Sequence, residues 1–156
     1  MPVIFTRVDD RLIHGQVVQA WLPELNIDEV VIPCKKEQEK TLNKNLLRLS
    51  LPFEYALAVL EPKHCVKYIT QSPKRILLLL RSLQDLQPLL EDGLQIKSIN
   101  IGGMHFKEKA QKLAENVFVS ELDKKTLSIL NDLGINIETR EVPSSKSISV
   151  KEILYS

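Results

Sequence analysis

Short apolar runs that alternate with helix-like stretches constrain the fold of this chain more than any other feature. The clearest run spans 76–80 and lies between Arg75 and Arg81. A run of this length suits a strand buried on both faces, and it is far too short to cross a bilayer, which needs about 20 residues. Comparable runs recur along the chain with amphipathic segments between them. The alternation predicts an α/β fold with a mostly parallel sheet and helices on both faces.

The expected elements are bounded by turn residues and by changes in apolar periodicity. The expected strands span 3–5, 29–32, 53–60, 75–80, 97–101, 116–119 and 135–141. The expected helices begin near His14 and cover 35–49, 62–69, 82–93 and 123–133, with a last helical turn at 149–154. The result is a sheet of about seven strands, in which we expect the last strand to be antiparallel.

Length and composition indicate one domain and exclude several classes of partner. The 156 residues fit a single domain over 1–156, with no repeat, linker or low-complexity tract to separate a second one. A net charge of +1 and a pI near 7.8 give no electrostatic footprint for nucleic acid or an anionic membrane. Cys34 and Cys65 are isolated, as in reduced cytosolic proteins, and the N-terminus reaches charge before a secretory leader forms. We therefore expect a cytoplasmic protein without membrane insertion.

The turn after the first expected strand, RVDDRLIHGQ at 7–16, carries the most distinctive chemistry. The imidazole of His14 offers a neutral ring nitrogen that can attack phosphorus near neutral pH. Arg11 offers a planar fork of donors that fits phosphate oxygens, and helix N-terminal amides at such a turn favour anions. Asp9 and Asp10 either accept the other ring N–H of His14 or shape the turn through their own backbone. The turn is therefore predicted to transfer phosphoryl groups.

The same run resembles the active-site loop of the IIB subunits of the mannose/fructose/sorbose class of bacterial sugar phosphotransferase systems (PTS). The resemblance continues through INIGGM at 99–104 and TREVP at 139–143 and covers nearly the whole chain. It implies that His14 is the phosphorylated nucleophile and Arg11 the neighbouring arginine that stabilises phosphate. Asp10 is assigned to orientation or loop shaping, and Gly15 leaves room for two proteins to bring their histidines together.

The resemblance also implies partners and a reaction. A IIA subunit would donate phosphate from its own phosphohistidine, and IIC and IID membrane subunits would hold the sugar that accepts it. The expected activity is that of a protein-phosphohistidine–sugar phosphotransferase acting on a hexose-type sugar. No metal or other cofactor is expected, and a homodimer is possible.

Further candidates lie at the carboxyl ends of other expected strands. Arg81 and Ser82 follow the strand at 75–80, which a parallel sheet can place beside the first strand, so either one is a candidate phosphate donor. Ser82 is equally suited to cap the next helix. Gly102 and Gly103 are expected to shape the site as a tight turn or to bring backbone amides close to a ligand. His105 matches no phosphorylated position.

One departure from the family supports an alternative function. After the second expected strand the chain has Pro33, Cys34, Lys35 and Lys36, where the family pattern has acidic residues. The alternative is a regulatory IIB-like protein that is phosphorylated and senses phosphotransferase flux without transporting sugar. A Rossmann-like nucleotide binder is disfavoured, because the chain has neither GxGxxG nor the P-loop lysine motif.

Overall fold

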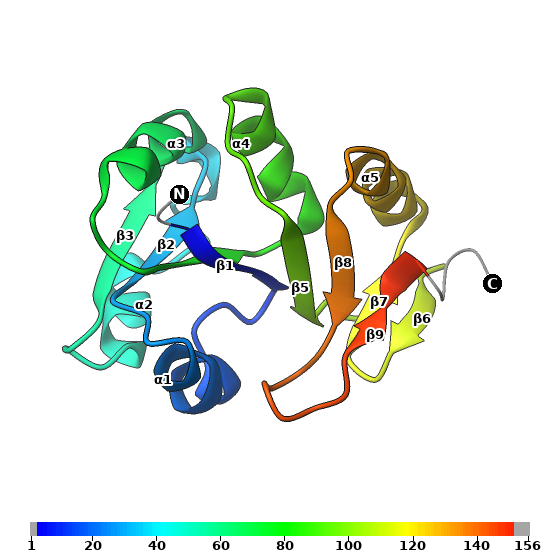
Figure 1. Ribbon diagram of the computed structural model, residues 1–156, viewed down its shortest axis with the longest axis horizontal. Helices are drawn as coiled ribbons and strands as arrows, with labels where there is room; N and C mark the ends of the chain where they lie inside the picture. The colour runs from blue at the N-terminus through cyan, green and yellow to red at the C-terminus, as the bar shows by residue number, and fades with distance from the viewer. Residues whose placement is uncertain (1–2, 152–156) are drawn as a thin grey trace.

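A computed structural model describes residues 3–151, and its centre is one seven-stranded sheet (Figure 1). The strand order is β3-β2-β4-β1-β5-β8-β9. These strands span Val3–Asp9 (β1), Glu29–Pro33 (β2), Ala56–Leu60 (β3), Ile76–Leu80 (β4), Ser98–Gly103 (β5), Asn136–Thr139 (β8) and Ile148–Ser149 (β9). Because β1 lies between β4 and β5, the turn that follows β1 emerges at the middle of the sheet.

The predicted α/β class with a mostly parallel sheet is confirmed. The pairs from β3 through β8 are parallel, and β9 pairs antiparallel with β8. The prediction for 116–119 needs correction, because that strand is β7 (Val117–Val119) and pairs with β6 (Gln111–Ala114) in a separate two-stranded sheet. The seventh strand of the main sheet is instead β9. The strand expected to be antiparallel, 135–141, corresponds to β8, which is parallel to β5.

Helices cover both faces of the sheet and create two apolar cores. One core packs residues of α3 (Pro62–Gln71), α4 (Gln87–Glu91) and α5 (Glu121–Asp132) against the sheet, and the other packs α1 (Leu22–Glu24) and α2 (Lys44–Ser50) on the opposite face. In β4, Ile76, Leu78 and Leu80 join the first core, while Leu77 and Leu79 join the second. All five side chains have no exposed surface, which explains the unbroken apolar run.

The helix predicted over 35–49 is wrong in its first half. A 3-10 turn at Lys36–Gln38 comes first, and α2 begins only at Lys44. The side chain of Asn43 accepts a hydrogen bond from the backbone N–H of Leu46 at 3.0 Å, so Asn43 is the N-cap that starts the helix. The charged residues of this stretch therefore belong mainly to a turn at the carboxyl end of β2.

A capping box at the start of α5 is expected to stabilise the fold. Ser120 accepts a hydrogen bond from the backbone N–H of Asp123 at 3.1 Å, and Asp123 accepts one from the backbone N–H of Ser120 at 2.9 Å. Replacing Ser120 by alanine removes one half of this capping box and is expected to lower the free energy of unfolding by about 1 kcal/mol. Chemical denaturation measures the change, and Ser144→Ala, on an exposed loop, is the control. An unchanged unfolding free energy in Ser120→Ala would contradict the capping role.

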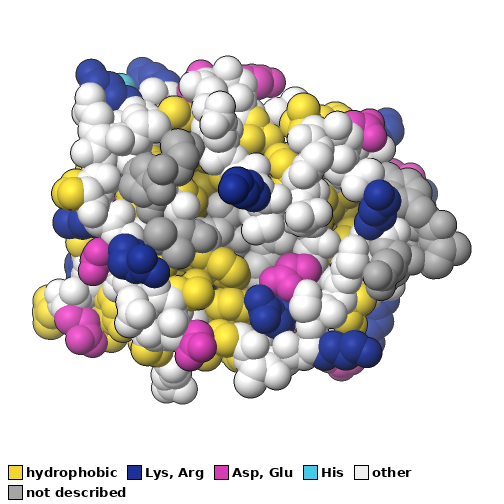
Figure 2. Space-filling view, viewed as in Figure 1, with side chains coloured by type: hydrophobic (Ala, Val, Ile, Leu, Met, Phe, Trp, Pro, Cys, Tyr) yellow, Lys and Arg dark blue, Asp and Glu magenta, His cyan; other side chains and the backbone are white. Residues whose placement is uncertain are grey.

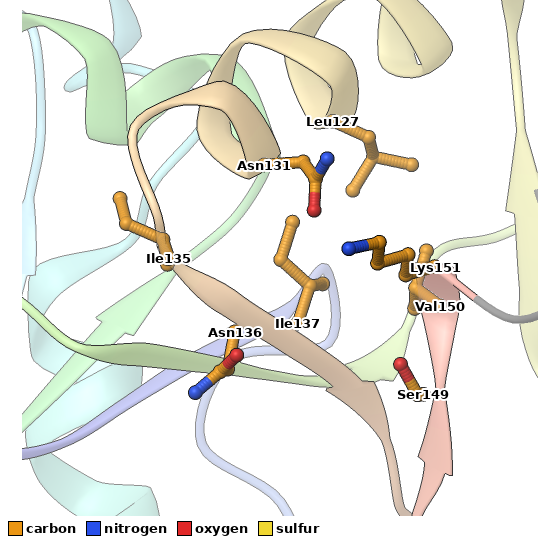
Figure 3. A pocket seen from close by; sticks show the side chains of 8 residues that line it. All are labelled: Leu127, Asn131, Ile135, Asn136, Ile137, Ser149, Val150 and Lys151. Carbon is orange, nitrogen blue, oxygen red and sulfur yellow. The ribbon is translucent and has the colours of Figure 1, made fainter.

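The chain after β9 packs back on the sheet, as predicted for its first residues. Val150 is buried, and with Lys151 it lines a small pocket between α5 and β8 together with Leu127 and Ile137 (Figure 3). Val150 and Lys151 are helical, and the rest of the predicted turn at 149–154 lies outside the described residues. Buried Val150 belongs to the same apolar core as Leu127 of α5.

Charged side chains of both signs share one face of the molecule (Figure 2). On the face drawn in Figure 2, Lys and Arg side chains are interspersed with Asp and Glu side chains. Within residues 3–151, no helix combines the length and the apolar character needed to cross a membrane.

Candidate active site

The first strand is longer than the sequence suggested, and this changes the origin of the site residues. Strand β1 continues to Asp9, so Arg7 and Asp9 lie on the strand and only the residues from Asp10 onward form the turn. Leu12 has a φ of 56°, a left-handed conformation, and its side chain is buried. This buried anchor folds the turn back over the end of the strand.

A helix begins directly after His14. The chain is helical from Gly15 to Glu24, with a π-helical segment at Val17–Trp21 that leads into α1. Buried Val17 and Trp21 fix this helix against the sheet. Trp21 is only 1% exposed and stacks on Phe5 with ring centroids 4.6 Å apart, so it is a core residue. The helix therefore holds His14 at a defined place above the end of β1.

Asp9 is the centre of the site, and its buried carboxylate accepts five hydrogen bonds. Nε2 of His14 lies 2.9 Å from Oδ2, which also accepts from Nη2 of Arg11 at 2.9 Å and from Nη2 of Arg7 at 3.1 Å. Oδ1 accepts from Nε of Arg11 at 2.9 Å and from its backbone N–H at 3.1 Å. An ionised carboxylate only accepts hydrogen bonds, so the proton of neutral His14 lies on Nε2 and the lone pair on Nδ1.

These donors keep Asp9 charged although it has no exposed surface. Burial alone would raise the pKa of Asp9, but the hydrogen bonds from His14 and Arg11 and the positive charge of Arg7 outweigh it and hold the pKa well below its usual range. The pKa of Arg11 is raised, chiefly by its hydrogen bond to Asp9. The site is thus a fixed anion between two arginines, with a partly exposed imidazole above it.

The structure shows which of the two aspartates contacts His14. Asp9, not Asp10, holds the ring of His14. Asp10 donates its backbone N–H to the carbonyl of Gly103 at 3.1 Å, and its carboxylate accepts from the backbone N–H and from Nδ1 of His105. Asp10 therefore ties the turn to the segment after β5.

Gly102 and Gly103 make room for side chains of the site. A Cβ at Gly102 would lie 1.8 Å from Nη2 of Arg7, and one at Gly103 would lie 2.9 Å from Oδ1 of Asp9 and 3.1 Å from Nη2 of Arg11. The register places Gly103 beside Asp9. Both glycines therefore contribute to the site because the absence of a side chain leaves room for Arg7, Asp9 and Arg11.

Arg81 and Ser82 lie at the same edge of the sheet, since Leu80 pairs with Val8. In the part of the chain that the structure describes, neither side chain hydrogen-bonds to Asp9, Arg11 or His14. The charge of Arg81 instead acts on half-buried Asp85 and on Cys34. Ser82 precedes a 3-10 turn at Leu83–Leu86 without a side-chain cap, so the capping prediction is wrong. The described residues also include no group of three or more His, Cys, Asp or Glu side chains that could hold a metal.

Comparison with known families identifies what kind of protein carries this site. A family model described as "PTS system sorbose subfamily IIB component" matches residues 3–156. The chain belongs to this family. The matched range includes the turn that carries Arg11 and His14. It also includes the INIGGM motif at 99–104 and the TREVP motif at 139–143.

Relatives and solved structures that resemble the chain are also phosphotransferase-system proteins with IIB components. The chain is 30% identical to the mannose-specific EIIAB component of Escherichia coli K12 over 99% of its own length and 49% of the relative, so it spans about half of that protein. It is 28% identical to the fructose-specific EIIB component of Bacillus subtilis over 99% of this chain and 96% of the relative. The IIBSor domain of the sorbose permease from Klebsiella pneumoniae has a TM-score of 0.89 at 26% identity and covers 99% of this chain and 97% of its own.

Sequence reasoning about this IIB chain missed Arg7, Asn100 and Gln16. Arg7 donates to Asp9 and to Oδ1 of Asn100 on β5, and Gln16 accepts from Nη2 of Arg11 at 3.1 Å. A signal for Arg7 was available, because Phe5, Arg7 and Asp9 continue the two-residue alternation of a strand. Asn100 gave no such signal, since only the sheet order brings it to Arg7.

Proposed function

We propose that this IIB protein is a phosphoryl carrier in which Nδ1 of His14 accepts phosphate from a phosphohistidine on a IIA subunit. The observation that carries the proposal is the 2.9 Å contact between Nε2 of His14 and the buried carboxylate of Asp9. This contact leaves Nδ1 unprotonated on a side chain that is 18% exposed. A reactive nitrogen is therefore available to a second protein without any opening of the fold.

The transfer follows from this geometry. The Nδ1 lone pair forms a bond to phosphorus while the bond to the donor histidine breaks, and the donor nitrogen keeps the electron pair. The imidazole of His14 becomes positive as it is phosphorylated, because Nε2 keeps its proton, and the Asp9 anion stabilises that charge. Arg11 is 40% exposed and beside His14, where its guanidinium can meet the phosphate oxygens.

In the second half of the reaction, a sugar hydroxyl oxygen forms a bond to phosphorus while the bond to Nδ1 of His14 breaks. Nδ1 keeps the electron pair, and the hydroxyl proton passes to solvent. The sugar is proposed to be of the hexose type and to be held by IIC and IID membrane subunits, with this chain on the cytoplasmic side. The names of the mannose-, fructose- and sorbose-specific relatives support a sugar of this kind.

Incubation with phosphoenolpyruvate, the general phosphotransferase proteins and a cognate IIA tests the proposal. Intact-mass analysis is expected to show one added phosphate that is lost in acid, and ³¹P NMR is expected to show attachment at Nδ1. Adding membranes that contain IIC and IID then separates the two roles, because a transporter subunit transfers the phosphate to sugar and a regulator does not. The carrier proposal fails if several IIA proteins leave the wild type unmodified.

Arg11→Lys is expected to slow phosphate acceptance about 100-fold, the usual order for loss of one oriented donor to a reacting oxyanion. A lysine keeps the charge but loses the fork that binds both oxygens of Asp9 while it faces the phosphate. Rapid-quench measurement of phosphate transfer from phosphorylated IIA gives the rate. Arg75→Lys, in which the arginine lies just before the amino end of β4, is the matched control and is expected to transfer at the wild-type rate. Equal rates for the two variants would remove Arg11 from the mechanism.

A further inference from the structure

Arg7 lies beneath the site and has no part in the transfer proposed above. Its side chain has no exposed surface, and its Nη2 donates to Oδ2 of Asp9 at 3.1 Å. Nε2 of His14 is 2.9 Å from the same oxygen. Arg7 is therefore linked to the reactive imidazole through one carboxylate oxygen, without contacting the imidazole or the surface where a partner would bind.

The guanidinium of Arg7 is fixed from several sides. Nη1 donates to Oδ1 of Asn100 and to the carbonyl of Arg140 at 3.0 Å, and Nη2 donates to the carbonyl of Glu141 at 3.1 Å. Its central carbon lies 5.2 Å from the centroid of the Trp21 ring. The cation thus sits against an aromatic face with its fork aimed at Asp9 and at β5.

Burial of the Arg7 cation has structural and energetic costs. Position 102 must be glycine, because a Cβ there would overlap the guanidinium of Arg7. Burial lowers the pKa of Arg7, while the charge of Asp9 and its hydrogen bond act in the opposite direction. Nε of Arg7 is buried without a hydrogen-bond partner among the described residues. An apolar side chain would avoid these costs, so the charge itself has a use at this position.

We propose that Arg7 is a positioning residue: it directs the Asp9 carboxylate at His14, and its positive charge offsets the attraction of that anion for a second proton on the imidazole, so that Nδ1 of His14 stays free to accept phosphate. The inference rests on the proposed function of His14. Without the Arg7 cation, the Asp9–His14 pair binds a proton at higher pH. A protonated imidazole has no lone pair on Nδ1, so phosphate acceptance then requires more alkaline solution.

Other charged groups near Asp9 and His14 also affect the proton affinity of these two residues. Arg11 contacts Asp9 directly, and Asp10 and Glu141 act on Arg11 through their charges. Among the described residues, Arg140, Glu138 and His105 are further charged or titratable groups on the segments that surround the site. Arg7 differs from all of these except Arg11 in sharing an oxygen of Asp9 with His14, and unlike Arg11 it is remote from the phosphate.

The test is the pH profile of phosphate acceptance from phosphorylated IIA in Arg7→Met. Loss of a cation that contacts Asp9 is expected to move the acid limb of the profile upward by about one pH unit. On the acid side of both midpoints the variant is then about tenfold slower relative to its own alkaline plateau than the wild type is to its plateau. A purely structural role lowers the rate by the same factor at every pH and leaves the profile in place.

Two further variants keep the inference falsifiable. Arg7→Gln removes the charge but keeps a donor for Asp9, and it carries the test if Arg7→Met does not fold. Arg7→Lys restores the charge and is expected to return the acid limb to its wild-type position. Arg140→Met is the matched control, because Arg140 also lies 5.2 Å over the Trp21 ring but does not contact Asp9. Its profile is expected to stay unshifted.

Failure of this inference is distinguishable from failure of the proposed function. An unshifted profile in folded Arg7→Met or Arg7→Gln overturns the role of Arg7 while phosphorylation of His14 stands. If the wild type accepts no phosphate, ¹⁵N NMR of the unmodified protein gives the second readout. The neutral imidazole of the wild type is expected to carry its proton on Nε2, and the uncharged variants Arg7→Met and Arg7→Gln are expected to become doubly protonated at higher pH than the wild type. Identical NMR titrations would overturn the role of Arg7.

Discussion

The His14→Gln protein is expected to accept no phosphate from phosphorylated IIA. Glutamine has no ring nitrogen that can form a bond to phosphorus, whereas its amide N–H₂ can still donate to Asp9 where Nε2 of His14 now does. The fold should therefore survive, with a free energy of unfolding within about 1 kcal/mol of the wild type. Intact mass after incubation with phosphoenolpyruvate and the donor proteins measures the loss.

The other two histidines provide matched controls for this experiment. His64 is exposed on α3, and His64→Gln is expected to leave acceptance unchanged. His105 contacts Asp10 through its ring, and His105→Gln is expected still to accept a single phosphate. Phosphate on His14→Gln, or its loss from His105→Gln, would move the phosphorylated residue away from His14.

Local sequence was sufficient to predict the parts of the molecule that depend on local physics. The apolar run of β4 predicted a strand buried on both faces, and its alternating side chains do enter two cores. The pairing of Arg11 with His14 in one turn indicated phosphate chemistry, and the structure places both on the same carboxylate. In these cases neighbouring residues carry the whole signal.

The predictions that failed depended on distant residues or on the direction of a side chain. Asp10 was predicted to orient His14 or to shape the loop, but Asp9 holds the ring because β1 ends at Asp9 rather than at Phe5. Arg7 and Asn100 are 93 residues apart, and they meet only because β5 pairs with β1. The strand at 116–119 was correctly placed along the chain, but nothing in its residues indicated that its partner is β6 and not the main sheet.

Asp9→Asn is expected to lower both the rate of phosphate acceptance and the stability of the fold. An asparagine can offer its N–H₂ group to His14 or leave the ring unheld, so the fixed Nε2–H tautomer is lost, and the rate is expected to fall about 10³-fold or more. The substitution also removes the one side-chain anion within residues 3–151 that contacts the fully buried cation of Arg7. Removing one partner of a buried pair costs about 3–5 kcal/mol, which urea unfolding at pH 7 measures.

The pH dependence of stability separates this electrostatic effect from a packing defect. The pKa of Asp9 is lower in the folded protein than the value of about 3.9 expected in the unfolded chain. The unfolded chain therefore binds the proton more tightly, so ionised Asp9 stabilises the fold above about pH 5 and this contribution is lost as the pH falls toward the folded value. Asp9→Asn lacks the contribution at every pH. The stability gap between wild type and variant should thus narrow from pH 5 to pH 2, whereas a packing defect alone would keep it constant.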